Sequence, residues 1–116
     1  MTRETVNAIC KALPGAQWSD PWGGGHDAWK VGGKMFATIG AVQDGVSVKT
    51  PSIEDAALLI DLGRAEKAPY FHRSWVRLDW TTLPEDELRV RIETSYRIIL
   101  NSLPKKVQRE INAPPA

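Results

Sequence analysis

The chain has 116 residues, of which 42% are hydrophobic and 25% are charged, and this size and balance fit one compact domain with its own core. Its 15 Lys and Arg against 14 Asp and Glu give a net charge of +1, which excludes a general attraction to polyanions and leaves only a local patch for nucleic acid. The single cysteine, Cys10, excludes an intramolecular disulfide. With no long apolar run and no signal-peptide pattern, we expect a cytoplasmic protein with no membrane role.

The first 15 residues predict a helix that ends in a turn. Val6, Ile9 and Cys10 recur at helical spacing within residues 2–13, and Pro14-Gly15 ends the pattern. Cys10 falls on the apolar stripe, and no histidine or aspartate stands at the spacing of a Cys–His catalytic motif. We therefore expect Cys10 to be a small buried residue rather than a nucleophile.

A glycine-rich loop is predicted at residues 20–25, after a short strand at residues 16–18. A phosphate-binding loop would follow a strand, open a helix and end in Gly-Lys-Ser/Thr, whereas here a strand comes next. The two histidines, His26 and His72, are far apart and lack the clustered spacing of a metal site. We therefore expect neither a metal nor any other cofactor.

The Gly32-Gly33 pair is the strongest local signal in the chain. It separates two alternating runs, residues 28–31 and 34–40, and adjacent glycines can take the positive φ angles of a two-residue hairpin turn. A second turn signal, Asp44-Gly45, precedes a further alternating run at residues 46–49. Together these segments predict a three-stranded antiparallel meander.

The second half of the chain predicts a helix, a strand and a longer helix. Ser52 is a suitable N-cap for the first helix, residues 64–73 form a loop, and residues 74–80 alternate as a strand. Pro84 is expected at the first position of the last helix, and Pro104 interrupts that helix before one further short turn. Its apolar stripe is expected to be buried, and the residues on it include Ile92, Tyr96 and Ile99.

Strand alternation also predicts which side chains share a face of the sheet. Lys34, Phe36 and Thr38 are expected on one face of their strand, and Trp75 and Arg77 on one face of theirs. If the registers align, cations interleave with aromatic rings on one sheet face, which suits a polyanion. The alternative is that Phe36 and Trp75 lie beneath a helix while the lysines extend at the rim.

Several segments, in order along the chain, resemble the MmcQ/YjbR family. These segments are Leu13-Pro14-Gly15, Trp22-Gly23, the hairpin from Lys30 to Ala37, Val48-Lys49, the run from Tyr70 to Val76, and the run from Ser95 to Ile99. The resemblance implies an α+β fold in which an antiparallel sheet packs against N- and C-terminal helices, similar to secretion-chaperone-like sandwiches. It also implies a DNA-binding role and brings no catalytic residues with it. We expect one domain over residues 1–111 and a frayed tail over residues 112–116.

The sequence thus indicates a binding protein rather than an enzyme. The leading hypothesis is weak binding of double-stranded DNA without sequence preference. The candidate contact residues are Lys30, Lys34, Lys49, Arg73, Trp75 and Arg77. A protein-interaction or chaperone-like module is the alternative, favoured by the near-neutral charge and the five tryptophans. A small-ligand or enzymatic role of the glycine-rich loop and the Tyr70–Trp75 region ranks third.

Overall fold

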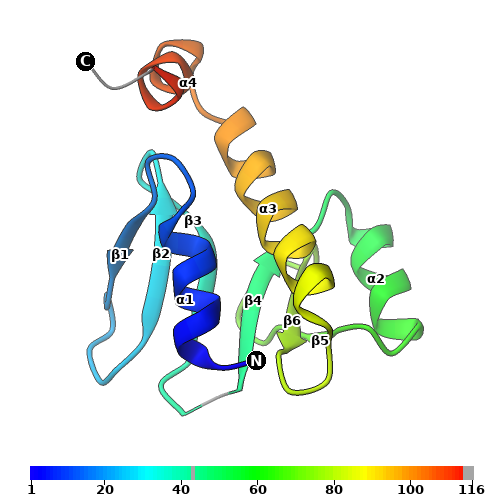
Figure 1. The fold of residues 1–116 in the computed structure, drawn as a ribbon. Coiled ribbons are helices and arrows are strands. Elements are labelled where there is room, and N and C mark those ends of the chain that lie inside the picture. Colours follow the sequence, from blue (N-terminus) through cyan, green and yellow to red (C-terminus); the bar gives the residue numbers. More distant parts are fainter. Residues whose placement is uncertain (43, 114–116) are drawn as a thin grey trace.

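One face of a six-stranded antiparallel sheet is covered by helices in the computed structural model, which describes residues 1–42 and 44–113 (Figure 1). The helices are α1 (Arg3–Lys11), α2 (Ile53–Asp61), α3 (Glu85–Asn101) and α4 (Lys105–Asn112). The strands are β1 (Gln17–Ser19), β2 (Asp27–Val31), β3 (Lys34–Ile39), β4 (Gly45–Lys49), β5 (Glu66–Lys67) and β6 (Trp75–Asp79). The strand order is β1-β2-β3-β4-β6-β5. The predicted α+β class and antiparallel sheet are confirmed.

The β2–β3 hairpin turns where the sequence predicts. Val31 pairs with Lys34, and Gly32 and Gly33 between them have φ angles of +57° and +82°. Two consecutive positive φ angles define the turn type whose twist matches that of the flanking strands. A Cβ on Gly32 would lie 2.5 Å from Cδ1 of Leu103, so the turn also packs closely against the connection between α3 and α4.

A β-bulge in β3 changes which side chains share a face. Lys30 pairs with Met35 and Trp29 pairs with Ala37, so the register passes over Phe36. The ring of Phe36 packs edge-to-face on Tyr96 of α3, with the ring centroids 5.4 Å apart. Because of this extra residue, Lys34 and Phe36 face the helices and Thr38 faces the opposite side, so the prediction that these three share a face is wrong.

The helix layer buries the predicted apolar stripes. Cys10 and Ile92 are fully buried, and Tyr96 and Ile99 are less than a tenth exposed, as expected. The Tyr96 hydroxyl donates a hydrogen bond to the Pro14 carbonyl at 2.5 Å, which ties α3 to the turn after α1. The stripes of the two helices therefore form one core with the sheet.

Ser95 places a buried hydroxyl between two strands. The pairing of β3 with β4 stops at Ala37 and Val48. Beyond it, the Ser95 hydroxyl donates to the Phe36 carbonyl at 2.6 Å and accepts from the Lys49 backbone N–H at 2.9 Å. The side chain of α3 thus continues the hydrogen-bond ladder where the bulge interrupts it.

Asp27 joins β2 to α1 and β1. Its carboxylate accepts hydrogen bonds from Arg3 Nε at 2.7 Å, Asn7 Nδ2 at 3.1 Å and Trp18 Nε1 at 2.6 Å. Partial burial acts to raise the pKa of Asp27, but these three donors and the Arg3 charge outweigh it and hold the pKa below its ordinary value. The ionised carboxylate therefore stabilises the N-terminal half of the fold.

The helix ends differ from expectation in detail. Ser52 accepts a hydrogen bond from the Asp55 N–H as the predicted N-cap of α2. Pro84 is the N-cap of α3, one position earlier than predicted. After Pro104 the chain forms α4 over eight residues, longer than the short turn expected. Asn112, the first residue of the predicted tail, ends this helix, and residues 114–116 lie outside the described residues.

The sheet also has one strand that the sequence did not indicate. Glu66 pairs with Arg77 and Lys67 pairs with Val76, which makes residues 66–67 the edge strand β5. Two residues carry no alternation that could be read from sequence, and only the pairing with β6 defines them. The segment predicted as a loop, residues 64–73, is therefore partly strand.

Candidate binding surfaces

The sheet face turned away from the helices carries a polar row across its centre. Thr38 pairs with Ser47, and Ser47 pairs with Arg77, so side chains of β3, β4 and β6 stand next to one another. Thr38 and Ser47 are both less than a tenth exposed. This row is the floor of a cleft of about 520 Å³, a volume within the range of small-molecule sites.

The glycine-rich loop forms one wall of this open-face cleft. Trp22 and His26 line it, with their rings in edge contact and the centroids 5.2 Å apart. The carboxylate of Asp20 accepts hydrogen bonds from the backbone N–H groups of Gly25 and His26 at 3.0 and 3.2 Å. The loop is thus held by its own hydrogen bonds, while more than half of the Trp22 side chain is exposed.

The opposite wall is the loop between β5 and β6. Tyr70 and Phe71 line it, and Phe71 stacks on Trp75 at a centroid distance of 4.8 Å. Tyr70 has a φ angle of +71°, which non-glycine residues rarely adopt, and its side chain is fully exposed. The two walls come from segments more than 40 residues apart in the sequence.

Arg77 provides the positive charge of the cleft. A Cβ on Gly45 would lie 2.5 Å from the guanidinium carbon of Arg77, so the side chain lies directly over β4 where there is no side chain to block it. Its Nη1 is 3.3 Å from Glu66 Oε2. Hydrogen bonds from Thr81, together with the Arg77 charge, hold the pKa of the neighbouring Asp79 below its ordinary value.

The predicted DNA-contacting residues are not brought together on one surface. Lys30, Lys49, Trp75 and Arg77 belong to the open face, but Lys49 Nζ donates to Ser74 Oγ at 2.7 Å and Arg77 lies beside acidic groups. Lys34 extends on the helix side, 3.5 Å from Ser102 Oγ. The exposed Arg73 sits in the loop before β6.

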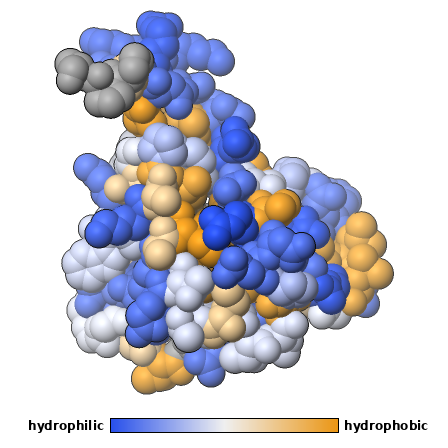
Figure 2. Space-filling model, viewed as in Figure 1, coloured by the Kyte–Doolittle hydropathy of each residue, from blue (hydrophilic) through white to orange (hydrophobic). Residues whose placement is uncertain are grey.

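A second surface, at the end of the molecule that carries α4, collects basic residues. The apolar side of α4 packs inward, since a Cβ on Gly15 would lie 3.0 Å from Cγ2 of Ile111. Helical geometry then directs the other side to solvent, where Lys105, Lys106 and Arg109 are exposed. Figure 2 shows this hydrophilic cap at the top of the molecule.

The charges of the protein are segregated along its length. Three segments meet at the α4 end, residues 11–17, 30–36 and 97–112, because Gly15 lies against Ile111, Gly32 against Leu103, and Lys34 beside Ser102. They hold seven of the 15 Lys and Arg but one of the 14 Asp and Glu. We call the exposed cations here the basic end, and they are Lys11, Lys34, Arg97, Lys105, Lys106 and Arg109. Only Lys34 of these six is among the predicted contact residues. The other five were missed because the basic run of α4 is short and because Lys11 and Arg97 lie on other helices.

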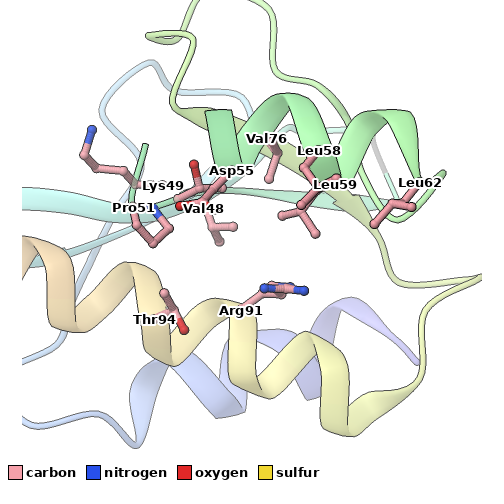
Figure 3. Close-up of a pocket in the computed structure, with 11 residues that line it drawn as sticks. Val48, Lys49, Pro51, Asp55, Leu58, Leu59, Leu62, Val76, Arg91 and Thr94 are labelled. Atoms are coloured by element: carbon pink, nitrogen blue, oxygen red, sulfur yellow. The ribbon is translucent and has the colours of Figure 1, made fainter. Parts of the chain in front are cut away.

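A third candidate surface is an apolar cleft of about 250 Å³ between α2, α3 and the sheet. Figure 3 shows Leu59 of α2 and Leu62, the residue after this helix, on one side of the cleft, and Arg91 and Thr94 of α3 on the other. Leu58 and Leu62 are each more than half exposed although they line the cleft. The side chain of Arg64 is paired with Glu87 and links the end of α2 to α3. Apolar residues of α2 are visible at the right of Figure 2.

The groups that could support covalent or metal chemistry are few. Burial, with a smaller contribution from Asp27, raises the pKa of the Cys10 thiol to about 12. Within residues 1–42 and 44–113, no three His, Cys, Asp or Glu side chains are grouped so that they could hold a metal ion. No helix of the described residues has the length and apolar character needed to cross a bilayer.

The element order and the single helix layer define an α+β domain built on an open antiparallel sheet. The chain belongs to the YjbR family, whose family model matches residues 11–98. The crystal structure of the Deinococcus radiodurans protein DR2400, a DUF419 domain, superposes with a TM-score of 0.83 at 20% identity, covering 97% of this chain and 89% of that one. At this identity the likeness shows the fold. No curated relative matches the chain.

Proposed function

We propose that this protein binds double-stranded DNA weakly and without sequence preference, through the basic end. The observation that carries the proposal is the segregation of charge: a net charge of +1 for the chain conceals an end that is almost purely cationic. A duplex presents one negative charge per roughly 1.7 Å of helix axis, so a local cationic surface is sufficient for non-specific binding. The family resemblance read from the sequence points to the same partner.

The geometry of α4 supports phosphate contacts rather than base recognition. Lys105 and Arg109 are one helical turn apart on the exposed side, and Lys106 is adjacent to them. Lys34 stands beside the end of α3, next to the start of α4. Flexible cations spread over about 6 Å of helix axis suit a phosphate backbone, and phosphate contacts carry no direct sequence information.

This proposal relocates the predicted contact surface. Lys34 remains a contact, and Lys30 lies in the strand next to it. Lys49, Arg73, Trp75 and Arg77 belong to the open face or its rim and are not part of the proposed DNA surface. The proposed role is that of a binding protein rather than an enzyme, in the cytoplasm, as the single reduced cysteine suggests.

The test is a fluorescence-anisotropy titration of a labelled duplex at several salt concentrations. Each phosphate neutralised contributes about −0.9 to the log–log salt slope, so engagement of all six cations of the basic end predicts a slope of about −5.4. The triple variant Lys105→Ala, Lys106→Ala, Arg109→Ala should bind more weakly and reduce the magnitude of the slope, to about −2.7. Alanine is the best helix former, so α4 is expected to persist.

A charge-matched control separates the surface from the net charge. The triple variant Lys67→Ala, Arg73→Ala, Arg89→Ala removes the same number of exposed cations from elsewhere. It should leave the salt slope close to that of the wild type. Equal loss of affinity in the two variants, or no wild-type binding at low salt, would contradict the proposed surface.

The second candidate function is the docking of a short apolar segment of a partner protein in the α2–α3 cleft. It rests on the exposure of Leu58 and Leu62, since leucines that line a groove and face solvent are typical of interaction sites. A peptide selected by display for binding to the wild-type protein should bind more weakly to the Leu62→Lys variant. Val90→Lys, at a similarly exposed position of α3, should leave affinity unchanged. Equal affinity for both variants would exclude this cleft.

A further inference from the structure

The open-face cleft lies on the opposite side of the sheet from the helices and is separate from both surfaces considered above. We propose that it binds a flat heteroaromatic ring of the nucleobase type, with the ring between the two aromatic walls and its hydrogen-bond acceptors toward the floor. The inference goes beyond DNA binding at the basic end, because neither site contributes a residue to the other.

The walls select for a flat ring. Trp22 with His26 on one side and Tyr70 with Phe71 on the other line the same space with aromatic rings. Phe71 is fixed by its stacking on Trp75, and His26 by the contact of its Nδ1 with the Gly23 carbonyl at 3.0 Å. Stacking between aromatic side chains tolerates any base, because every base has a π face.

Two of the wall residues, Trp22 and Tyr70, leave much of their aromatic surface in water. Tyr70 is fully exposed and holds a left-handed backbone conformation, and Trp22 is more than half exposed. Large apolar side chains in water are unfavourable, and strained residues concentrate at ligand sites. A ring bound between them would remove both side chains from water.

The floor requires acceptors on the edge of the ligand. An arginine donates hydrogen bonds and accepts none, and the Arg77 side chain lies flat over Gly45 at the base of the cleft. The hydroxyls of Thr38 and Ser47 stand in the same row and can donate or accept. Ring nitrogens and carbonyl oxygens of purines and pyrimidines meet this pattern. Glu66 and Asp79 beside Arg77 offset its charge, so a neutral acceptor edge suits the floor as well as an anionic group does.

The ring could be that of a free nucleotide or an unpaired base of a single strand, and the experiment distinguishes the two. The tryptophan indole N–H signals of ¹⁵N-labelled protein are followed by NMR, with the Trp22 signal assigned from Trp22→Phe. The probes are the four ribonucleoside 5′-monophosphates and, separately, five-nucleotide single-stranded homopolymers, each at millimolar concentration. We expect a saturable shift of the Trp22 signal with at least one probe, while the signal of the buried Trp29 remains in place.

The variants decide the location. Tyr70→Gly removes one wall while suiting the positive φ angle, and it should weaken the binding at least fivefold. Trp18→Phe changes an exposed ring outside the cleft and should leave the affinity unchanged. The triple variant Lys105→Ala, Lys106→Ala, Arg109→Ala should leave monophosphate binding unchanged. The test of the open-face cleft is therefore independent of the test of DNA binding at the basic end. Saturation by monophosphates identifies a free nucleotide, and binding of the homopolymers alone identifies an unpaired base. The proposal is overturned if no probe shifts the Trp22 signal, or if Tyr70→Gly binds as well as the wild type.

Discussion

Replacing Ser95 by alanine should destabilise the fold strongly, because its hydroxyl completes the ladder between β3 and β4. The Ser95 side chain is fully buried and satisfies two backbone groups, the Phe36 carbonyl and the Lys49 N–H. Alanine fits the space but offers neither a donor nor an acceptor. Both backbone groups would then be buried without a partner.

The magnitude follows from those two groups. A buried polar group left without a hydrogen bond costs about 1–3 kcal/mol, so two of them give a loss of about 2–6 kcal/mol. For a urea m-value of about 1.5 kcal/mol/M, a loss of about 3 kcal/mol lowers the unfolding midpoint by about 2 M. This is a large fraction of the stability of a typical small domain.

Urea unfolding followed by tryptophan fluorescence measures the effect, with Ser102→Ala as the matched control. Ser102 is exposed and its hydroxyl donates to the Ile99 carbonyl of its own helix, so we expect a change of less than about 0.5 kcal/mol. A loss below about 1 kcal/mol for Ser95→Ala would refute the reasoning. It would mean that β3 and β4 close and form the backbone hydrogen bond directly.

Three further predictions concern individual side chains. The pKa of Asp27 is lowered in the folded protein, so the stability that its carboxylate contributes is present at neutral pH and is lost as the pH falls below the ordinary value of 3.8. In urea unfolding, Asp27→Asn should therefore be less stable than the wild type at pH 7, and the difference between the two proteins should narrow in acid. Cys10 should react with a thiol reagent at the rate of global or local unfolding, because it is buried and its pKa is raised to about 12; rapid labelling of the native protein would contradict this. Gly32→Ala should destabilise more than Gly33→Ala in thermal unfolding, because both positions have positive φ but only the first would bring a Cβ against Leu103. Equal losses would show that Leu103 adjusts freely.

The sequence alone determined the features that depend on neighbouring residues. The Gly32-Gly33 turn, the Ser52 cap and the burial of Cys10 follow from φ preferences, capping geometry and a spacing of three to four residues, and all three were predicted correctly. The short segments that resemble the MmcQ/YjbR family also sufficed to indicate the YjbR family, because they occur in the expected order along the chain.

The tertiary structure decided everything that depends on register and on long-range packing. The bulge at Phe36 moves the side chains that precede it in β3 to the other face of the sheet. A bulge is defined by the pairing with the neighbouring strand, so the alternation of residues within one strand cannot predict it. The basic end forms because the turn at Gly15 and the hairpin at Gly32 meet α4 and the end of α3. The open-face cleft exists because two loops distant in sequence flank the same three strands. Such meetings are set by the packing of the whole core, whereas charge and aromatic content in a linear sequence carry no information about which segments will face one another.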